Sequence, residues 1–313
     1  MHIADGVLDA KTALAAGILA AAGLGYALHH ARKTLPPRKV PLLGLSAAFV
    51  FAAQMINFPV AGFISGHLVG GVLVAALLGP SAAVIVISTV LIVQCLAFAD
   101  GGITALGANI FNMAILGGAV GGMLYGFLAR FSKTLFGRLV AAIIASWIVV
   151  ELASIAAAGE LAASGKVPWN VAFPLIAGVH ALIGIGEGAI TALVLSAIAA
   201  ARPELVMSHE GARENQPSRM RNLRPLIAFG LLAALGLALF VAPFASKLPD
   251  GLEYVAQRLG FAAREESHPA LWPDYTPIAA GIATLLLFPL AWLIARIIVP
   301  KSVPTTPAKL NEP

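Results

Sequence analysis

Nine apolar segments separated by short polar stretches constrain the fold of this chain more than any other feature. Hydrophobic residues make up 59% of the 313 residues and charged residues only 11%, which is too apolar for a water-soluble domain. A helix needs roughly 17 to 25 apolar residues to cross a bilayer. We therefore predict an all-α integral membrane protein, a polytopic helical bundle with a seven-span core and two C-terminal spans. The predicted spans are 10–29, 40–58, 67–79, 82–98, 108–128, 139–158, 173–200, 225–245 and 277–298.

The third of these spans, 67–79, is too short to cross upright, so it must be shielded by its neighbours or continue an outer loop.

With all nine counted, fifteen of the twenty Lys and Arg residues fall on one side, which the positive-inside bias makes cytoplasmic. The N-terminus is then outside, at the same face as His67, and the C-terminus is cytoplasmic. The net charge of +5 reflects these loops, so no nucleic-acid partner is expected. The fifteen are Arg32, Lys33, Arg38, Lys39, Arg130, Lys133, Arg138, Arg202, Arg213, Arg219, Arg221, Arg224, Arg296, Lys301 and Lys309.

The first eight residues, Met1-His2-Ile3-Ala4-Asp5-Gly6-Val7-Leu8, carry an unusual set of metal donors. A signal peptide would begin with a cationic patch and an apolar run, so we expect this terminus to be retained. The Met1 amine, the His2 amide nitrogen and the His2 imidazole can close two fused chelate rings on one divalent ion. This set favours tetragonal Ni(II) or Cu(II) and admits Co(II). The competing interpretation is that His2 is only a polar residue on an exposed terminus.

A square plane needs a fourth donor, and His67 is the candidate. It lies in Ser65-Gly66-His67-Leu68-Val69-Gly70-Gly71, where the glycines allow close backbone approach. The alternative is an interfacial histidine hydrogen-bonded to a carbonyl group. We also consider Asp5, Asp100 and Asn109 as residues that hold a ligand histidine through its second nitrogen. For Asp100 and Asn109, capping of the following helix is an equally plausible role.

Two ionisable residues, His180 and Glu187, fall within the predicted span 173–200. Placing an ionisable side chain in the hydrocarbon core of a bilayer costs free energy, so such a residue indicates a function by default. The spacing of seven residues puts both side chains on one face of the helix. A proton-coupled secondary transporter using them is therefore the alternative to metal capture by the N-terminus. A buried polar pair that fastens helices together is the structural alternative.

The chain beyond residue 200 is divided into a cytoplasmic linker, 201–224, a two-span module, 225–300, and a cytoplasmic tail, 301–313. The linker is rich in Arg, Glu, Pro, Ser and Asn, and the module carries Pro249-Asp250-Gly251-Leu252-Glu253. The sequence has no Walker A motif, so any ATPase that drives transport must be another polypeptide. An intramembrane metal-dependent enzyme is disfavoured because no general base is positioned beside an open metal site.

Four separated motifs resemble the CbiM/NikM substrate-binding (S) components of energy-coupling factor (ECF) cobalt and nickel transporters. They are Met-His-Ile-x-Asp-Gly at the N-terminus, Ser-Gly-His-Leu-x-Gly-Gly at 65–71, Asp-Gly-Gly with Leu-Gly-x-Asn-x-Phe-Asn-Met at 100–113, and 180–188. The resemblance covers residues 1–200, departs from the family at Ala4, where Pro is frequent, and extends to a fused CbiN/NikN-like PDGLE module.

Several expectations follow from this resemblance. It implies a non-catalytic subunit without a resident cofactor, which captures Ni(II) or Co(II) as its transported ligand at the extracellular face. The ligands would be Met1, His2 and His67, and the partners a transmembrane coupling subunit and cytoplasmic ATPases. The protein would lie among the lipids of a bacterial or archaeal cell membrane. The sequence does not choose between the two ions.

Overall fold

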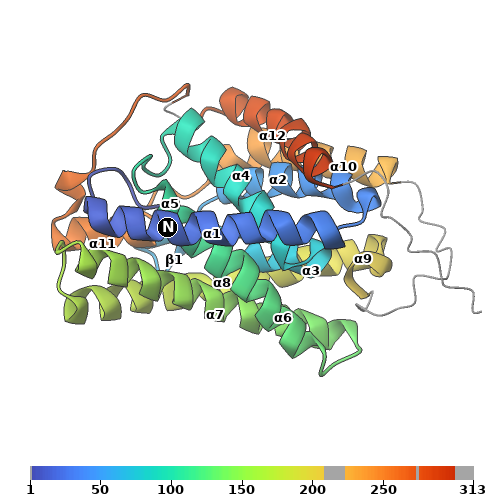
Figure 1. The fold of residues 1–313 in the computed structure, drawn as a ribbon, viewed down its shortest axis with the longest axis horizontal. Helices are drawn as coiled ribbons and strands as arrows, with labels where there is room; N and C mark the ends of the chain where they lie inside the picture. Colours follow the sequence, from blue (N-terminus) through green and yellow to red (C-terminus); the bar gives the residue numbers. More distant parts are fainter. Residues whose placement is uncertain (1, 208–222, 273–274, 300–313) are drawn as a thin grey trace, which may run out of the picture.

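The computed structural model describes residues 2–207, 223–272 and 275–299. Most of its helices run close to the long axis of an elongated bundle (Figure 1). Within the described residues, the sheet structure amounts to a single two-stranded hairpin. The predicted class, an all-helical polytopic membrane protein, is confirmed.

Seven helices in the described part of the chain are long and apolar enough to cross a membrane. Each falls within a few residues of a predicted span, because the length of an apolar run is a local property of the sequence. Two of the seven are continuous helices assembled from shorter elements, one of them around an 11-residue π-helical stretch. The seven are α1 (Ala10–Thr34), α4 (Pro80–Phe98), α5-η2-α6 (Leu106–Asn109, Ile110–Val120, Gly121–Ala129), α7 (Leu135–Ala163), α8 (Trp169–Ala201), α10-η3-η4 (Arg224–Gly236, Leu237–Val241, Ala242–Phe244) and α12 (Pro277–Ile298).

Two predicted spans, 40–58 and 67–79, are shorter in the structure, so nine full-length spans is an overestimate. They correspond to α2 (Val40–Gln54) and α3 (Gly71–Leu78), of 15 and 8 residues. At 1.5 Å per residue these helices are about 22 and 12 Å long, whereas the hydrocarbon core is about 30 Å thick. Between them lies an antiparallel hairpin of β1 (Phe58–Val60) and β2 (Ile64–Gly66), in which Pro59 pairs with Ser65. The chain runs through α2 toward the hairpin and through α3 away from it. The later helices therefore keep the same alternating directions that nine full-length spans would give them.

The irregular backbone around His67 is buried and has its polar groups satisfied by side chains. Gln54 Nε2 donates to the carbonyl of Val69 at 2.9 Å, and the Glu187 carboxylate accepts from the amides of Val69 and Gly70 at 2.6 and 2.9 Å. Non-helical backbone at membrane depth is tolerated only where it is covered by protein in this way.

The C-terminal helices are part of the main bundle. Both α10 and α12 pack against α2, and α12 also contacts α4. Contact with α2 is close, because a Cβ on Gly44 would come within 2.5 Å of the Phe288 carbonyl oxygen. The short helix α11 (Gly251–Leu259) packs on α8 and β2. The remaining short elements are η1 (Pro37–Lys39), α9 (Pro203–Met207) and η5 (Ala262–Arg264).

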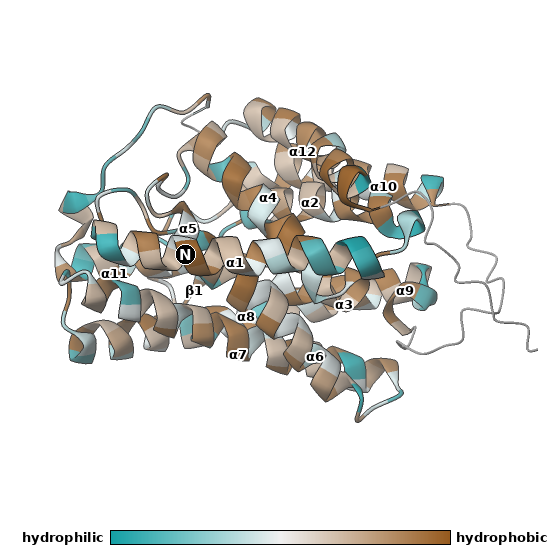
Figure 2. Ribbon diagram, viewed as in Figure 1, coloured by the Kyte–Doolittle hydropathy of each residue, from teal (hydrophilic) through white to brown (hydrophobic). Residues whose placement is uncertain are grey.

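Hydrophilic residues gather toward both ends of the bundle (Figure 2), but the two ends differ in the charged residues that they carry. One end carries the basic residues at the termini of α1, α6, α8, α10 and α12. The opposite end holds the N-terminal segment, the loop that follows α4, and the helix α11. This end carries Asp5, Asp9, Asp100 and Asp250. Arg213, Arg219, Arg221, Lys301 and Lys309, which contributed to the predicted orientation, lie outside the described residues.

Candidate metal site

The backbone of the N-terminal segment is fixed by hydrogen bonds to residues about 100 positions away. Ile3 N donates to Asn109 Oδ1 at 2.8 Å, and Asn109 Nδ2 donates back to the Ile3 carbonyl at 3.0 Å. Gly102 N donates to the same carbonyl at 2.9 Å, and the Ile3 side chain is fully buried. Asn109 therefore holds the peptide that carries His2. It does not cap α5, whose N-cap is Ala105.

Asp5 attaches the same segment to the loop after α4. Its carboxylate accepts from Thr104 N at 2.7 Å and from Ile103 N at 3.0 Å, and His268 Nδ1 lies 2.8 Å from Oδ2. Burial works against the charged carboxylate, but the bonds from Thr104 and Ile103 hold the pKa of Asp5 below its usual value. Asp5 thus positions the N-terminal segment and the loop relative to each other.

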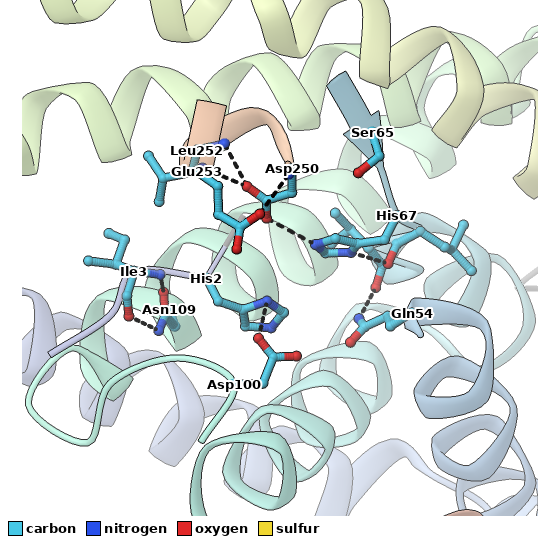
Figure 3. A network of polar contacts seen from close by, with 12 residues as sticks. His2, Ile3, Gln54, Ser65, His67, Asp100, Asn109, Asp250, Leu252 and Glu253 are labelled. Atoms are coloured by element: carbon cyan, nitrogen blue, oxygen red, sulfur yellow. Dashed lines mark hydrogen bonds and ion pairs between the residues drawn. The ribbon is translucent and has the colours of Figure 1, made fainter. Parts of the chain in front are cut away.

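His2 and His67, which are 65 positions apart, lie side by side at this end of the bundle (Figure 3). Their rings are stacked with centroids 5.4 Å apart and planes 21° from parallel. Each side chain is only 8% exposed. The Leu68 carbonyl lies 3.1 Å from His67 Nδ1. With its proton on Nδ1, His67 presents the Nε2 lone pair that a metal would take.

Each imidazole faces one carboxylate. His2 Nδ1 lies 3.2 Å from Asp100 Oδ1, and Tyr275 donates to the other oxygen of Asp100 at 2.7 Å. His67 Nε2 lies 4.0 Å from Asp250 Oδ2. Sequence reasoning assigned Asp100 to the surroundings of the site but missed Asp250. The Pro-Asp-Gly-Leu-Glu motif was the available signal, although nothing local connects it to His67.

Burial disfavours the protonated form of both imidazoles. Burial lowers the pKa of His2 below its ordinary value, although Asp100 opposes this shift. Burial also lowers the pKa of His67. A metal binds only the neutral imidazole, so burial favours the form of each ring that could bind one.

His180 and Glu187 each bond to a different part of the backbone. Glu187 accepts from the two backbone amides of Val69 and Gly70, and His180 Nδ1 lies 2.8 Å from the Ile176 carbonyl of its own helix. Both are 2% exposed. Glu187 therefore supports the loop after His67, and His180 lines a small cavity that also includes His67 and Asp250.

The described side chains do not form a metal site by themselves. Within residues 2–207, 223–272 and 275–299, no group of three or more His, Cys, Asp or Glu side chains has an arrangement that could hold a metal ion. Two imidazoles alone do not complete a metal site. Met1, the predicted source of an amine ligand, lies outside the described residues.

Comparison with known families agrees with this architecture. Residues 2–205 match the family model CbiM, described as the cobalt uptake substrate-specific transmembrane region. The chain belongs to the CbiM family. Residues 224–272 match a second model, the PDGLE domain, so a CbiM region and a PDGLE domain are fused in one polypeptide.

Several relatives share the CbiM region, and some share the fusion. A protein of Archaeoglobus fulgidus, named provisionally as the fused nickel transport protein NikMN, is 38% identical over 95% of this chain and 98% of its own. The fused nickel transport protein NikMN of Rhodobacter capsulatus is 34% identical over 75% of this chain and 71% of its own. A crystal structure of a truncated transition metal transporter superposes with a TM-score of 0.57 at 32% identity, covering 64% of this chain and 99% of that one. This chain is accordingly a membrane transport protein.

The site combines residues of both family regions. The CbiM region contributes His2, His67 and Asp100, and the PDGLE domain contributes Asp250 and His268. Two hydrogen bonds join the regions directly beside His67. Ser65 N donates to the Pro249 carbonyl at 2.8 Å, and Ser65 Oγ donates to the Leu248 carbonyl at 2.7 Å.

Proposed function

We propose that this CbiM-family protein captures Ni(II) or Co(II) at the extracellular face of a cell membrane. The ligands are the Met1 amine, the amide nitrogen and Nδ1 of His2, and Nε2 of His67. The observation that carries the proposal is the stacking of the His2 and His67 rings, 5.4 Å apart, within a buried site flanked by two carboxylates. Chelation through Nδ1 replaces the contact of His2 with Asp100.

The second part of the proposal concerns energy and partners. The sequence holds no Walker A motif, so ATP is hydrolysed by cytoplasmic ATPases of an ECF complex and coupled through a separate transmembrane subunit. The basic end of the bundle faces these partners in the cytoplasm. The site at the opposite end then faces outward, where the ion enters.

A spectrum of the nickel complex tests the four-nitrogen site. Protein purified with its native N-terminus should bind one Ni(II) per chain, and the complex should be yellow and diamagnetic because a four-nitrogen, square-planar field pairs the nickel electrons. Metal analysis and magnetic measurements provide these readings. A paramagnetic, six-coordinate spectrum at equilibrium would contradict the geometry.

Uptake in cells tests the energy source. Nickel accumulation should stop when the ATPase subunit carries a Walker A Lys→Ala substitution, and it should survive an uncoupler for as long as cellular ATP is maintained. The control is the same cell without this chain. Uptake that persists without a functional ATPase but collapses with the uncoupler would favour the proton-coupled mechanism through His180 and Glu187.

A further inference from the structure

Two buried polar atoms beside the proposed chelate have no hydrogen bond. One is Nε2 of His2, and the other is Oε1 of Gln94 in α4; neither has a partner among the described residues. The Gln94 side chain is buried, at 1% exposed. A buried polar group without a partner costs folding free energy, so each such group in a native structure needs an explanation.

The direction of the Gln94 amide is fixed by the Val69 carbonyl, two residues after His67. A carbonyl can only accept, so Gln54 must present Nε2 to it, and it does so at 2.9 Å. The other end of Gln54 is therefore Oε1, which accepts from Gln94 Nε2 at 2.9 Å. Gln94 thus donates to Gln54 and keeps Oε1 as a free acceptor. Figure 3 shows Gln54 beside the loop that carries His67.

The Gln94 side chain lies close to the His2 imidazole. Burial lowers the pKa of His2, and Gln94 is near enough to oppose this shift as a hydrogen-bond partner of the ring. A partner that raises the pKa of a histidine accepts from its ring, which is the role left to Oε1. The Tyr275 hydroxyl is also near Gln94, but its hydrogen is donated to Asp100 and so does not serve Oε1.

Chelation through Nδ1 decides which nitrogen of His2 carries the ring hydrogen. The metal takes the lone pair of Nδ1, so Nε2 keeps its hydrogen and becomes a donor. A ligand histidine almost always donates this hydrogen to an acceptor, which fixes the tautomer and the plane of the ring. Asp100, which was expected to hold a ligand histidine in this way, instead faces Nδ1, the atom that chelation uses.

We propose that Gln94 Oε1 accepts from Nε2 of the metal-bound His2 imidazole, which makes Gln94 a positioning residue of the metal site. The bond satisfies both buried atoms at once. It also connects the two ligand histidines, because the amide chain through Gln54 ends on the loop that carries His67. This inference rests on the proposed function.

The ring hydrogen of His2 gives a direct test in the wild type. The diamagnetic Ni(II) complex, prepared from the full chain with its native N-terminus and isotope-labelled histidine, is suited to proton–nitrogen NMR. The Nε2 hydrogen of His2 should give a signal that exchanges slowly with water, because it is buried and hydrogen-bonded. In Gln94→Leu, which removes the acceptor, this signal should shift and exchange faster.

Affinity gives a second test, by isothermal titration with nickel chloride. Gln94→Leu should weaken Ni(II) binding by about 10- to 100-fold, as loss of an outer-shell partner does. Gln94→Glu restores an oxygen acceptor and should recover at least about 10-fold of that loss. Thr89→Val is the matched control, since Thr89 is a buried residue of the same helix whose hydroxyl bonds to the Ile85 carbonyl. It should change affinity by less than about 2-fold.

Three results would overturn the inference. The first is a His2 ring hydrogen that exchanges rapidly with water in the wild-type complex, a result that does not depend on the folding of any variant. The second is wild-type affinity in Gln94→Leu. The third is a Gln94→Glu protein that binds as weakly as Gln94→Leu, which would assign the loss to packing. Failure of the wild-type protein to bind Ni(II) would instead overturn the proposed function.

Discussion

Adding three alanines before Met1 should abolish nickel binding. The extension converts the primary amine of Met1 into a peptide amide, so the terminal donor and its five-membered chelate ring are lost together. Loss of an outer-shell partner alone costs about 10- to 100-fold in metal affinity, and loss of a chelating ligand should therefore cost at least roughly 100-fold. Isothermal titration of Ni(II) into the extended and native proteins measures the difference.

The chain cannot compensate for this extension by sliding along its site. Ile3 is held at both its amide and its carbonyl, and its side chain is fully buried. Sliding by three residues, which would return the new terminus to the site, would break these bonds and place an added alanine in the pocket of Ile3. Three alanines added after Pro313 are the control and should leave affinity unchanged. Equal nickel affinity in the N-terminally extended protein would refute the amine ligand.

The helices could be predicted from sequence more completely than the segment that carries His67. The predicted span 277–298 coincides with α12, because its apolar run and its termini are local features. The run 40–79 is equally apolar, yet the chain breaks after Gln54. This break depends on Gln54 and Glu187, which satisfy the backbone of residues 69 and 70 from α2 and α8. Pro59, Gly62 and Gly66 were the local signals for it.

The candidate site, like the fold, could be predicted from the sequence only in part. Counting spans and charges was sufficient to expect His2 and His67 at one face, because alternation along the chain depends only on order. The roles of Asn109 and Asp250 could not be obtained in this way. Asn109 binds the backbone of Ile3 and not an imidazole, and Asp250 reaches His67 only because Ser65 pairs with residues 248 and 249. Such pairings depend on tertiary packing and leave no periodic signal in the sequence.

Substituting His67 should weaken nickel binding far more than substituting His180. The two histidines are both buried, 8% and 2% exposed, and they line the same cavity, so either change to alanine removes a similar volume from the same region. His67→Ala also removes the fourth nitrogen of the proposed square plane, and the expected loss of affinity is at least roughly 100-fold. His180 bonds to the Ile176 carbonyl within α8, so His180→Ala should change affinity by less than about 5-fold.

Thermal unfolding separates this ligand effect from damage to the fold. Both variants create a cavity beside Gly251, and their melting temperatures should fall by similar amounts in the absence of metal. Added Ni(II) should raise the melting temperature of His180→Ala as it does that of the wild type, because an ion that binds only the folded state stabilises it. It should not raise that of His67→Ala at the same concentration. The opposite order of affinities would move the binding site into α8 and make His180 the ligand.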